Sequence, residues 1–340
     1  AVSVAGAAAI GRLFPSLSGG LSVSMIAIGI LWFFQATNAL GARSTGRLAI
    51  VSAVLKILPL IAVLIVLTQV SLAGEPLEPL APMPLTLDNI AAASALTLFA
   101  LLGFENATAP VDKIQDPQRT LPRALIAGTL SVALLYLLTS TAILLLLAPD
   151  AANQSNAPFA DAIGRGWGEA GAIFAALGIA ISAAGYVNAN ILVCGELAYS
   201  MALRRELPAV LARTVGDNTA LNAQITGTVI TSLLILANMS KGTGDLFTFM
   251  ALLTACATLW LYLTASLAAL KQRPSGAALG TILIGLAFTL FAFYGSGWEA
   301  NLWSMALIAA GAVLYALMRW RGDSSRAAEA PPAAPPESAA

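Results

Sequence analysis

The sequence predicts an all-α polytopic membrane protein, and three observations support this class. First, 58% of the 340 residues are hydrophobic and only 10% are charged, whereas an ordinary soluble domain carries roughly 25% charged residues. Second, the mean hydropathy is +0.83. Third, apolar runs recur along nearly the whole chain, each close to the ~20 residues that a helix needs to cross a bilayer. A β-barrel would instead show alternating segments of about ten residues.

The apolar runs predict ten membrane spans, of which the first is partial. The chain begins at Ala1 inside an apolar run without a preceding charged segment, which is unlike a signal peptide. We therefore expect a fragment that starts partway through a membrane helix. We also expect a transmembrane domain over 1–320 and a disordered, Pro- and Ala-rich cytoplasmic tail over 321–340. The predicted spans are 1–14, 21–40, 48–70, 90–111, 122–148, 170–200, 222–238, 246–270, 277–294 and 300–320.

The charges of the loops predict an orientation. Thirteen Lys and Arg side chains fall in one alternating set of loops and in the C-terminal tail, whereas the other loops hold only Arg12, Arg165 and Lys241. Positively charged loops stay on the cytoplasmic side of a membrane. The first set of loops and the C-terminus are therefore expected in the cytoplasm.

The composition argues against several kinds of function. The 17 basic residues balance the 17 acidic ones, so no basic surface indicates nucleic acid, and the chain has no histidine for metal binding or base catalysis. Cys194 and Cys256 lie in apolar runs and are expected to act as small buried hydrophobes. The sequence shows no nucleophile–base pair. We therefore expect neither an enzyme nor a bound cofactor or metal.

One carboxylate, Glu105, interrupts the apolar stretch 90–111 between Gly103 and Pro110, which both weaken helical hydrogen bonding. A charge at the centre of a membrane helix costs about 2.5–3.5 kcal/mol on insertion scales. Two interpretations stay open. Glu105 is a proton-titratable gate or coupling group beside a substrate cavity, or it accepts hydrogen bonds from backbone amides that the helix break releases. A charged, interrupted membrane helix favours a transporter.

Lys56 is a second charge inside a predicted span, in 48–70. One interpretation is that its long stem lets the ammonium reach the cytoplasmic interface. The other is that the ammonium occupies the place of a coupling cation, in which case transport would be independent of sodium. The sequence supports both equally.

The segment Gly103–Ala107 and the connector 116–124, Asp-Pro-Gln-Arg-Thr-Leu-Pro-Arg-Ala, together resemble amino acid–polyamine–organocation (APC) permeases. The likeness is strongest to the basic amino acid/polyamine antiporter family, whose typical activity is arginine/agmatine exchange. It implies the inverted-repeat fold of LeuT-type transporters, with broken first and sixth helices and a substrate site at the midplane. This chain would lack the first two helices, part of the third and half of the site, so we expect these residues alone not to transport.

The resemblance also assigns residues of the sixth helix. Phe99 matches a family tryptophan that packs on the bound side chain, and Leu102 matches a neighbouring cavity residue. Gly103 and Glu105 belong to the motif itself, with Glu105 at the position of the gating glutamate. The resemblance therefore places substrate contacts and gating on this broken helix.

Three further positions come from other helices. Asn190 falls where the antiporters have a tryptophan on the eighth helix, and Met250 falls where they have a serine on the tenth. Lys56 resembles the fifth-helix lysine that replaces a sodium in proton-coupled relatives. Cation–π contact with a guanidinium is best over tryptophan. Phenylalanine at 99 and asparagine at 190 therefore permit a neutral or smaller substrate.

The resemblance implies an amino acid or polyamine permease of the bacterial inner membrane that works by alternating access. Arginine/agmatine-like exchange and proton-coupled transport are the two mechanisms it implies. The expected partners are a small amino acid or amine, protons, the lipid bilayer and a second copy of the chain. The alternative is a non-transporting receptor or structural subunit derived from a permease, which would bind ligand without flux.

Overall fold

The fold is built around one long helix, α7, which contacts α1, α2, α3, α5 and α8. The computed structural model describes residues 1–39, 45–80, 85–103, 116–215 and 219–329, with side chains for all of these except 45–54, 56, 117 and 321–329. Its α-helices are α1 (Val2–Leu13), α2 (Gly20–Ala39), α3 (Thr45–Leu72), α4 (Leu87–Leu101), α5 (Pro117–Leu146), α6 (Pro149–Gln154), α7 (Pro158–Leu203), α8 (Leu221–Ala237), α9 (Thr243–Lys271), α10 (Ala277–Gly295) and α11 (Gly297–Glu329).

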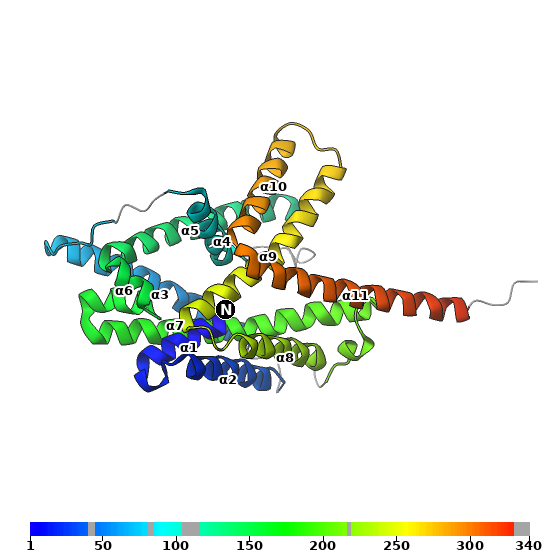
Figure 1. The fold of residues 1–340 in the computed structure, drawn as a ribbon, viewed down its shortest axis with the longest axis horizontal. Helices are drawn as coiled ribbons and strands as arrows, with labels where there is room; N and C mark the ends of the chain where they lie inside the picture. The colour runs from blue at the N-terminus through cyan, green and yellow to red at the C-terminus, as the bar shows by residue number, and fades with distance from the viewer. Residues whose placement is uncertain (40–44, 81–84, 104–115, 216–218, 330–340) are drawn as a thin grey trace, which may run out of the picture.

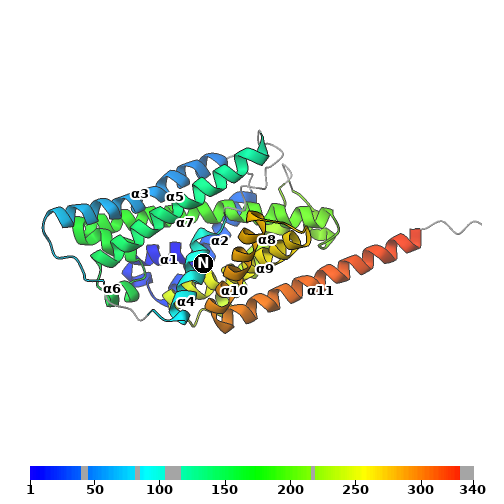
Figure 2. The same cartoon turned by 90° about the horizontal axis from the view of Figure 1, so that it is seen from above.

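The helices form two groups around α7. In Figure 1, α7 runs along the long axis of the molecule with α1, α2 and α8 beside it, and Figure 2 shows α3 and α5 side by side along it. The second group contains α4, which packs on α9 and α10, and α11, which packs on α9. Within the second group, α4 is also in contact with α5 of the first group, so it lies where the two groups meet.

The predicted all-α fold is confirmed, and every predicted span contains a helix. Six of the described helices are long and apolar enough to cross a bilayer, namely α2, α5, α7, α9, α10 and α11. Shorter apolar segments lie in α1, α3, α4 and α8. Large hydrophobic side chains such as Leu130, Ile284 and Val313 are more than half exposed. Such an extensive apolar surface is unfavourable in water and fits a lipid environment.

The structure departs from the predicted spans at three places, of which the first is α11, which continues to Glu329 beyond the predicted span 300–320. The helix expected over 90–111 ends at Leu101. The helix expected over 170–200 is the second part of α7, which bends at Gly168, where φ is +65° and ψ is −164°. The preceding part of α7 and the short helix α6 each begin with a proline in the first turn, a position that suits proline. Polar residues in 149–169 concealed these helices from a search for apolar runs.

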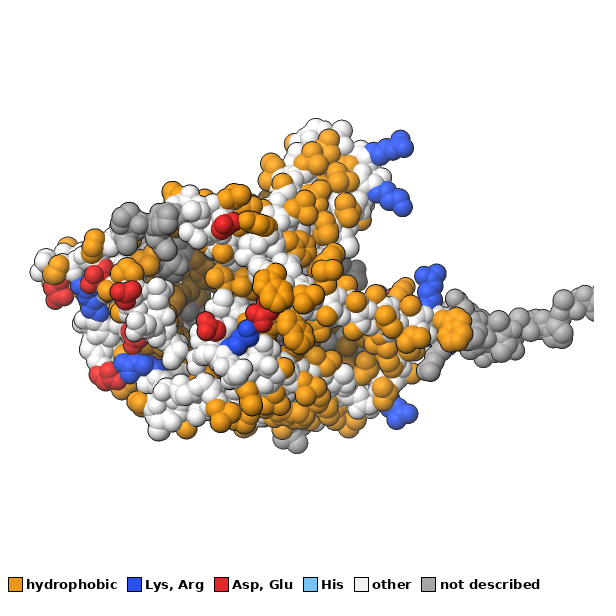
Figure 3. All heavy atoms as spheres, in the orientation of Figure 1, with side chains coloured by type: hydrophobic (Ala, Val, Ile, Leu, Met, Phe, Trp, Pro, Cys, Tyr) orange, Lys and Arg blue, Asp and Glu red, His pale blue; other side chains and the backbone are white. Residues whose placement is uncertain are grey.

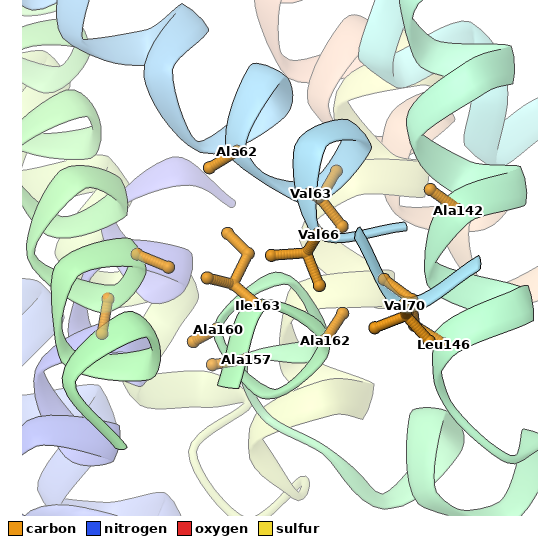
Figure 4. Close-up of a cluster of buried hydrophobic side chains, with 12 residues drawn as sticks. Ala62, Val63, Val66, Val70, Ala142, Leu146, Ala157, Ala160, Ala162 and Ile163 are labelled. Atoms are coloured by element: carbon orange, nitrogen blue, oxygen red, sulfur yellow. The ribbon is translucent and has the colours of Figure 1, made fainter. Parts of the chain in front are cut away.

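A fully buried apolar core joins α3, α5 and α7 (Figure 4). Val63 and Val66 of α3 lie against Ile163 of α7, and Leu146 comes from α5. A Cβ on Gly166 would lie 2.6 Å from Cγ1 of Val66, so glycine is what lets the two helices approach this closely. Small residues at helix contacts are typical of membrane proteins, where close packing replaces the hydrophobic effect.

Many of the charged side chains in Figure 3 lie toward the two ends of the molecule, and a smaller group lies near the middle of this face. In the orientation of Figure 3, acidic side chains, with some basic ones, lie at the end that α6 and the first part of α7 occupy. The opposite end shows Lys and Arg side chains near the ends of α9 and α11. The length of the helices separates these two ends, as expected for a chain that crosses a bilayer.

Candidate functional site

A cavity of about 440 Å³ lies between α4, α7, α8 and α9 and reaches the first residues of the chain. This volume lies in the range of small-ligand pockets, roughly 300–1,000 Å³. Most of the lining is apolar, and a few polar side chains are placed within it. The residues used below are Phe99 of α4, Asn190 of α7, Gln224 and Thr228 of α8 and Thr254 of α9.

Helix α4 ends two residues before Gly103, close to the position where the sequence predicts a break. The Thr86 hydroxyl accepts a hydrogen bond from the Asn89 amide at the start of α4, at 3.2 Å, as is usual for a helix N-cap. At the other end, Leu102 is extended and Gly103 has a φ of +105°. Glycine reaches this region without steric cost. The break therefore follows directly from Gly103.

The cavity brings together two of the predicted site residues. Phe99 lies in the last turn of α4, and its ring packs edge-on against Phe247 of α9 with centroids 6.0 Å apart. Asn190 lies on α7, where its Oδ1 is 3.9 Å from the Sγ of Cys194, a long thiol contact. Both Phe99 and Asn190 line the cavity. A ligand there would contact an aromatic face from α4 and an amide from α7.

Three other predicted residues, Met250, Leu102 and Gly103, are not among the described residues that line the cavity. Met250 is buried in an apolar core with Val187 and Leu253, and it is not among the described residues that line the cavity. Thr254, one turn further along α9, lines the cavity and donates its hydroxyl to the Met250 carbonyl at 2.8 Å. Leu102 packs against a small core that α9 and α10 share, and Gly103 forms the break. The position assigned to Met250 therefore lies one helical turn away from the cavity wall.

The two predicted charged residues cannot be placed. Glu105 lies in 104–115, outside the described residues, and the side chain of Lys56 is also outside them. Among the side chains that the structure does describe, there is no cluster of acidic and cysteine residues able to hold a metal ion.

A row of polar contacts joins α2 to α8 beside the cavity, and the sequence analysis did not identify it. The Trp32 indole donates to the Ser232 hydroxyl at 3.2 Å. Further along, the Thr228 hydroxyl donates to Oε1 of Gln35 at 3.0 Å, and Nε2 of Gln35 lies 3.5 Å from Oε1 of Gln224. We call these five residues the polar seam. In the sequence, the polar seam could have been found as polar residues that recur three or four positions apart within two apolar helices. This spacing places the residues of each helix on one face of that helix.

Ion pairs bind the helices at the acidic end of the molecule. The Arg12 guanidinium at the end of α1 contacts Asp161 at 3.0 Å and Glu169 at 3.1 Å. These two carboxylates lie on either side of the bend at Gly168. Near the start of α9, Lys241 pairs with Glu299 of α11 at 2.9 Å. None of these charged residues is among the described residues that line the cavity.

Comparison with known proteins agrees with this architecture. A family model described as amino acid permease matches residues 1–318. The chain belongs to the amino acid permease family. It is 25% identical over 312 residues to the putrescine transporter PotE of Escherichia coli (strain K12), a match that covers 88% of this chain and 70% of the relative. The PotE transporter of Haemophilus influenzae is 24% identical over 322 residues, covering 92% and 74%.

The chain is also similar, over a shorter stretch, to the serine/threonine exchanger SteT of Bacillus subtilis. The two are 30% identical over 121 residues, and this match covers 35% of this chain and 28% of the relative. The family and these relatives identify the chain as a membrane transporter of small molecules, not an enzyme. The relatives differ in the substrates that their names give, so the cavity itself must supply the argument about substrate.

Proposed function

We propose that this permease moves small amino acids or amines across the bacterial inner membrane by alternating access. The observation that carries the proposal is the cavity of about 440 Å³ at the end of a broken helix. Helix ends at membrane depth present unpaired backbone groups to a substrate, and such breaks mark transporter binding sites. The two helix groups, which meet at α4, are the parts that would move against each other.

The side chains of the cavity favour a substrate that is neutral or smaller than arginine. The lining includes Phe99 of α4 and both Tyr186 and Asn190 of α7. None of these three offers the surface of a tryptophan, over which cation–π contact with a guanidinium is strongest. Arginine/agmatine-like exchange is therefore one candidate activity, and exchange or proton-coupled uptake of a smaller amino acid is the other.

The proposal assigns coupling and gating to the charged residues that the sequence singled out. Glu105 follows the break at Gly103 by two residues, and in this role it would take up or release a proton as the cavity opens and closes. Lys56 would occupy the place of a coupling cation. Protons are then the coupling ion, and transport is independent of sodium.

The orientation and assembly follow the same reasoning. The end of the molecule that carries Lys and Arg in Figure 3 would face the cytoplasm together with the C-terminus. The exposed apolar faces of α10 and α11 would contact lipid or a second copy of the chain. Cysteine accessibility from either side of the membrane tests the orientation directly.

The test of the substrate proposal is a change of selectivity in the protein expressed from its complete gene. Asn190→Trp enlarges the aromatic surface of the cavity and is expected to shift competition toward arginine and agmatine relative to serine. The assay is inhibition of labelled amino acid uptake in proteoliposomes. Identical competition profiles for Asn190→Trp and wild type would contradict the proposed role of Asn190. Ligand-induced stabilisation without any flux would instead indicate a receptor.

A further inference from the structure

Gln224 has an unused hydrogen-bond donor beside the cavity. The residue lines the cavity and is only 2% exposed. Its Nε2 has no hydrogen-bond partner among the described residues. A buried amide donor without a partner is costly, and more so at membrane depth where bulk water does not reach. An apolar side chain of similar size would avoid that cost, so the amide calls for a partner that the described residues do not supply.

The contacts of Gln224 in the structure engage its amide oxygen and leave its N–H₂ group without a partner among the described residues. Its Oε1 is 3.5 Å from Nε2 of Gln35, and Oε1 of Gln35 accepts the Thr228 hydroxyl at 3.0 Å. On the α7 side, a Cβ on Gly195 would lie 2.3 Å from Cγ of Gln224, so α7 packs directly on the Gln224 stem. The oxygen is therefore engaged with α2, and the N–H₂ group remains for a ligand.

We propose that Gln224 donates this N–H to an acceptor oxygen of the transported molecule, so that the permease favours amino acids over diamines that carry no oxygen. The inference rests on the proposed function, because it requires that the cavity be the substrate site. A carboxylate, amide or hydroxyl oxygen satisfies the donor. A diammonium such as putrescine has N–H donors and no acceptor oxygen. It would therefore leave the Gln224 N–H unpaired, and Gln224 would offer no acceptor to the ammonium groups of putrescine.

The decisive variant is Gln224→Glu in the protein expressed from its complete gene. Glutamate has the same shape and can still accept from Gln35, and in its ionised form it replaces the donor with an acceptor oxygen. Loss of one hydrogen bond is expected to weaken competition by serine, glutamine and arginine about tenfold, whereas competition by putrescine strengthens. Gln154→Glu makes the same chemical change on α6, outside the cavity lining, and is expected to leave both kinds of competition as in wild type.

Two measurements keep the inference separate from the proposed function. Uptake into proteoliposomes tests transport, and the shift in thermal stability on adding serine, glutamine, arginine or putrescine tests binding. Wild-type protein could bind amino acids without taking them up, and Gln224→Glu could weaken that binding. This combination would support the inference and contradict the transporter proposal. If Gln224→Glu does not fold, Gln224→Met serves instead, with loss of amino acid binding as the expected result.

Three results would overturn the inference. Unchanged amino acid affinity in the folded variant would mean that water satisfies the N–H. Stronger wild-type binding of putrescine than of the three amino acids would mean that the amide presents its oxygen to the cavity. No binding of any of these amino acids by wild type would exclude the oxygen-bearing class as ligands.

Discussion

The contact between α10 and α4 allows a sharp test of the packing that positions the broken helix. Gly295 ends α10, and a Cβ built there would lie 1.9 Å from the carbonyl oxygen of Ala91 on α4 and 2.8 Å from the Ala92 amide nitrogen. A hydrogen bond from the Tyr294 hydroxyl to Asp88 joins the same two helices. Because α4 carries Phe99 in its last turn, this contact holds one wall of the cavity in place.

The expected effect of Gly295→Ala follows from these distances. Ordinary contact begins near 3.4 Å, so the two helices would have to separate by about 1.5 Å. The atoms that a new methyl group meets are backbone, which cannot rotate away as a side chain can. Overpacking typically costs about 1–3 kcal/mol, and we expect the upper part of that range here. The apparent Tm should fall by several degrees, and substrate affinity should fall with it because Phe99 moves.

Thermal unfolding can be followed with a thiol-reactive dye, because Cys256 is buried among the described residues. A Cys194→Ser background removes the exposed thiol from the signal. The matched control is Gly285→Ala in the same helix, where a Cβ would meet nothing within 4 Å and alanine gains up to about 1 kcal/mol of helix propensity. The control should therefore equal or exceed the starting Tm. Equal Tm values for Gly295→Ala and Gly285→Ala would refute the close α4–α10 contact.

Three further predictions concern other parts of the molecule. Arg12→Gln removes the ion pairs to Asp161 and Glu169. Because these side chains are partly exposed, the free energy of unfolding should fall by at most about 1 kcal/mol. Amide hydrogen exchange in the first part of α7 should nevertheless become faster, and unchanged exchange would count against the pairing. Gln35→Leu removes the centre of the polar seam and should lower stability by about 1 kcal/mol, whereas a wild-type Tm would show that the seam is energetically neutral. Glu105→Gln should change the rate and pH dependence of transport, and identical pH profiles would exclude Glu105 as the coupling group.

The helices and the break were accessible from the sequence because membrane insertion imposes local rules. A run of about 20 apolar residues must form a helix when no water is present to bind the backbone. Gly103 sits two residues before a charge, and the structure shows the left-handed backbone there that glycine permits. The segment before Gly168 was missed because short, polar helices outside the apolar runs carry no such signal.

The cavity was only partly predictable because it depends on partners distant in the sequence. Phe99 and Asn190 were identified through family resemblance, and both line the cavity. The position given to Met250 missed the wall by one turn, since counting along a helix fixes a face but not the depth of a residue along it. Gln35 and Gln224 are 189 residues apart. Their pairing arises from the packing of α2 against α8, which periodicity within either helix does not reveal.

Counterflow in proteoliposomes tests the central claim of transport most directly. Vesicles containing the protein from its complete gene are preloaded with unlabelled amino acid and diluted into the labelled form, with empty vesicles as the control. The alternating-access account predicts saturable accumulation of label that requires the preloaded amino acid or an imposed proton gradient. Ligand-induced stabilisation of the folded protein with no flux under either condition would contradict it and identify a binding protein built on the permease fold.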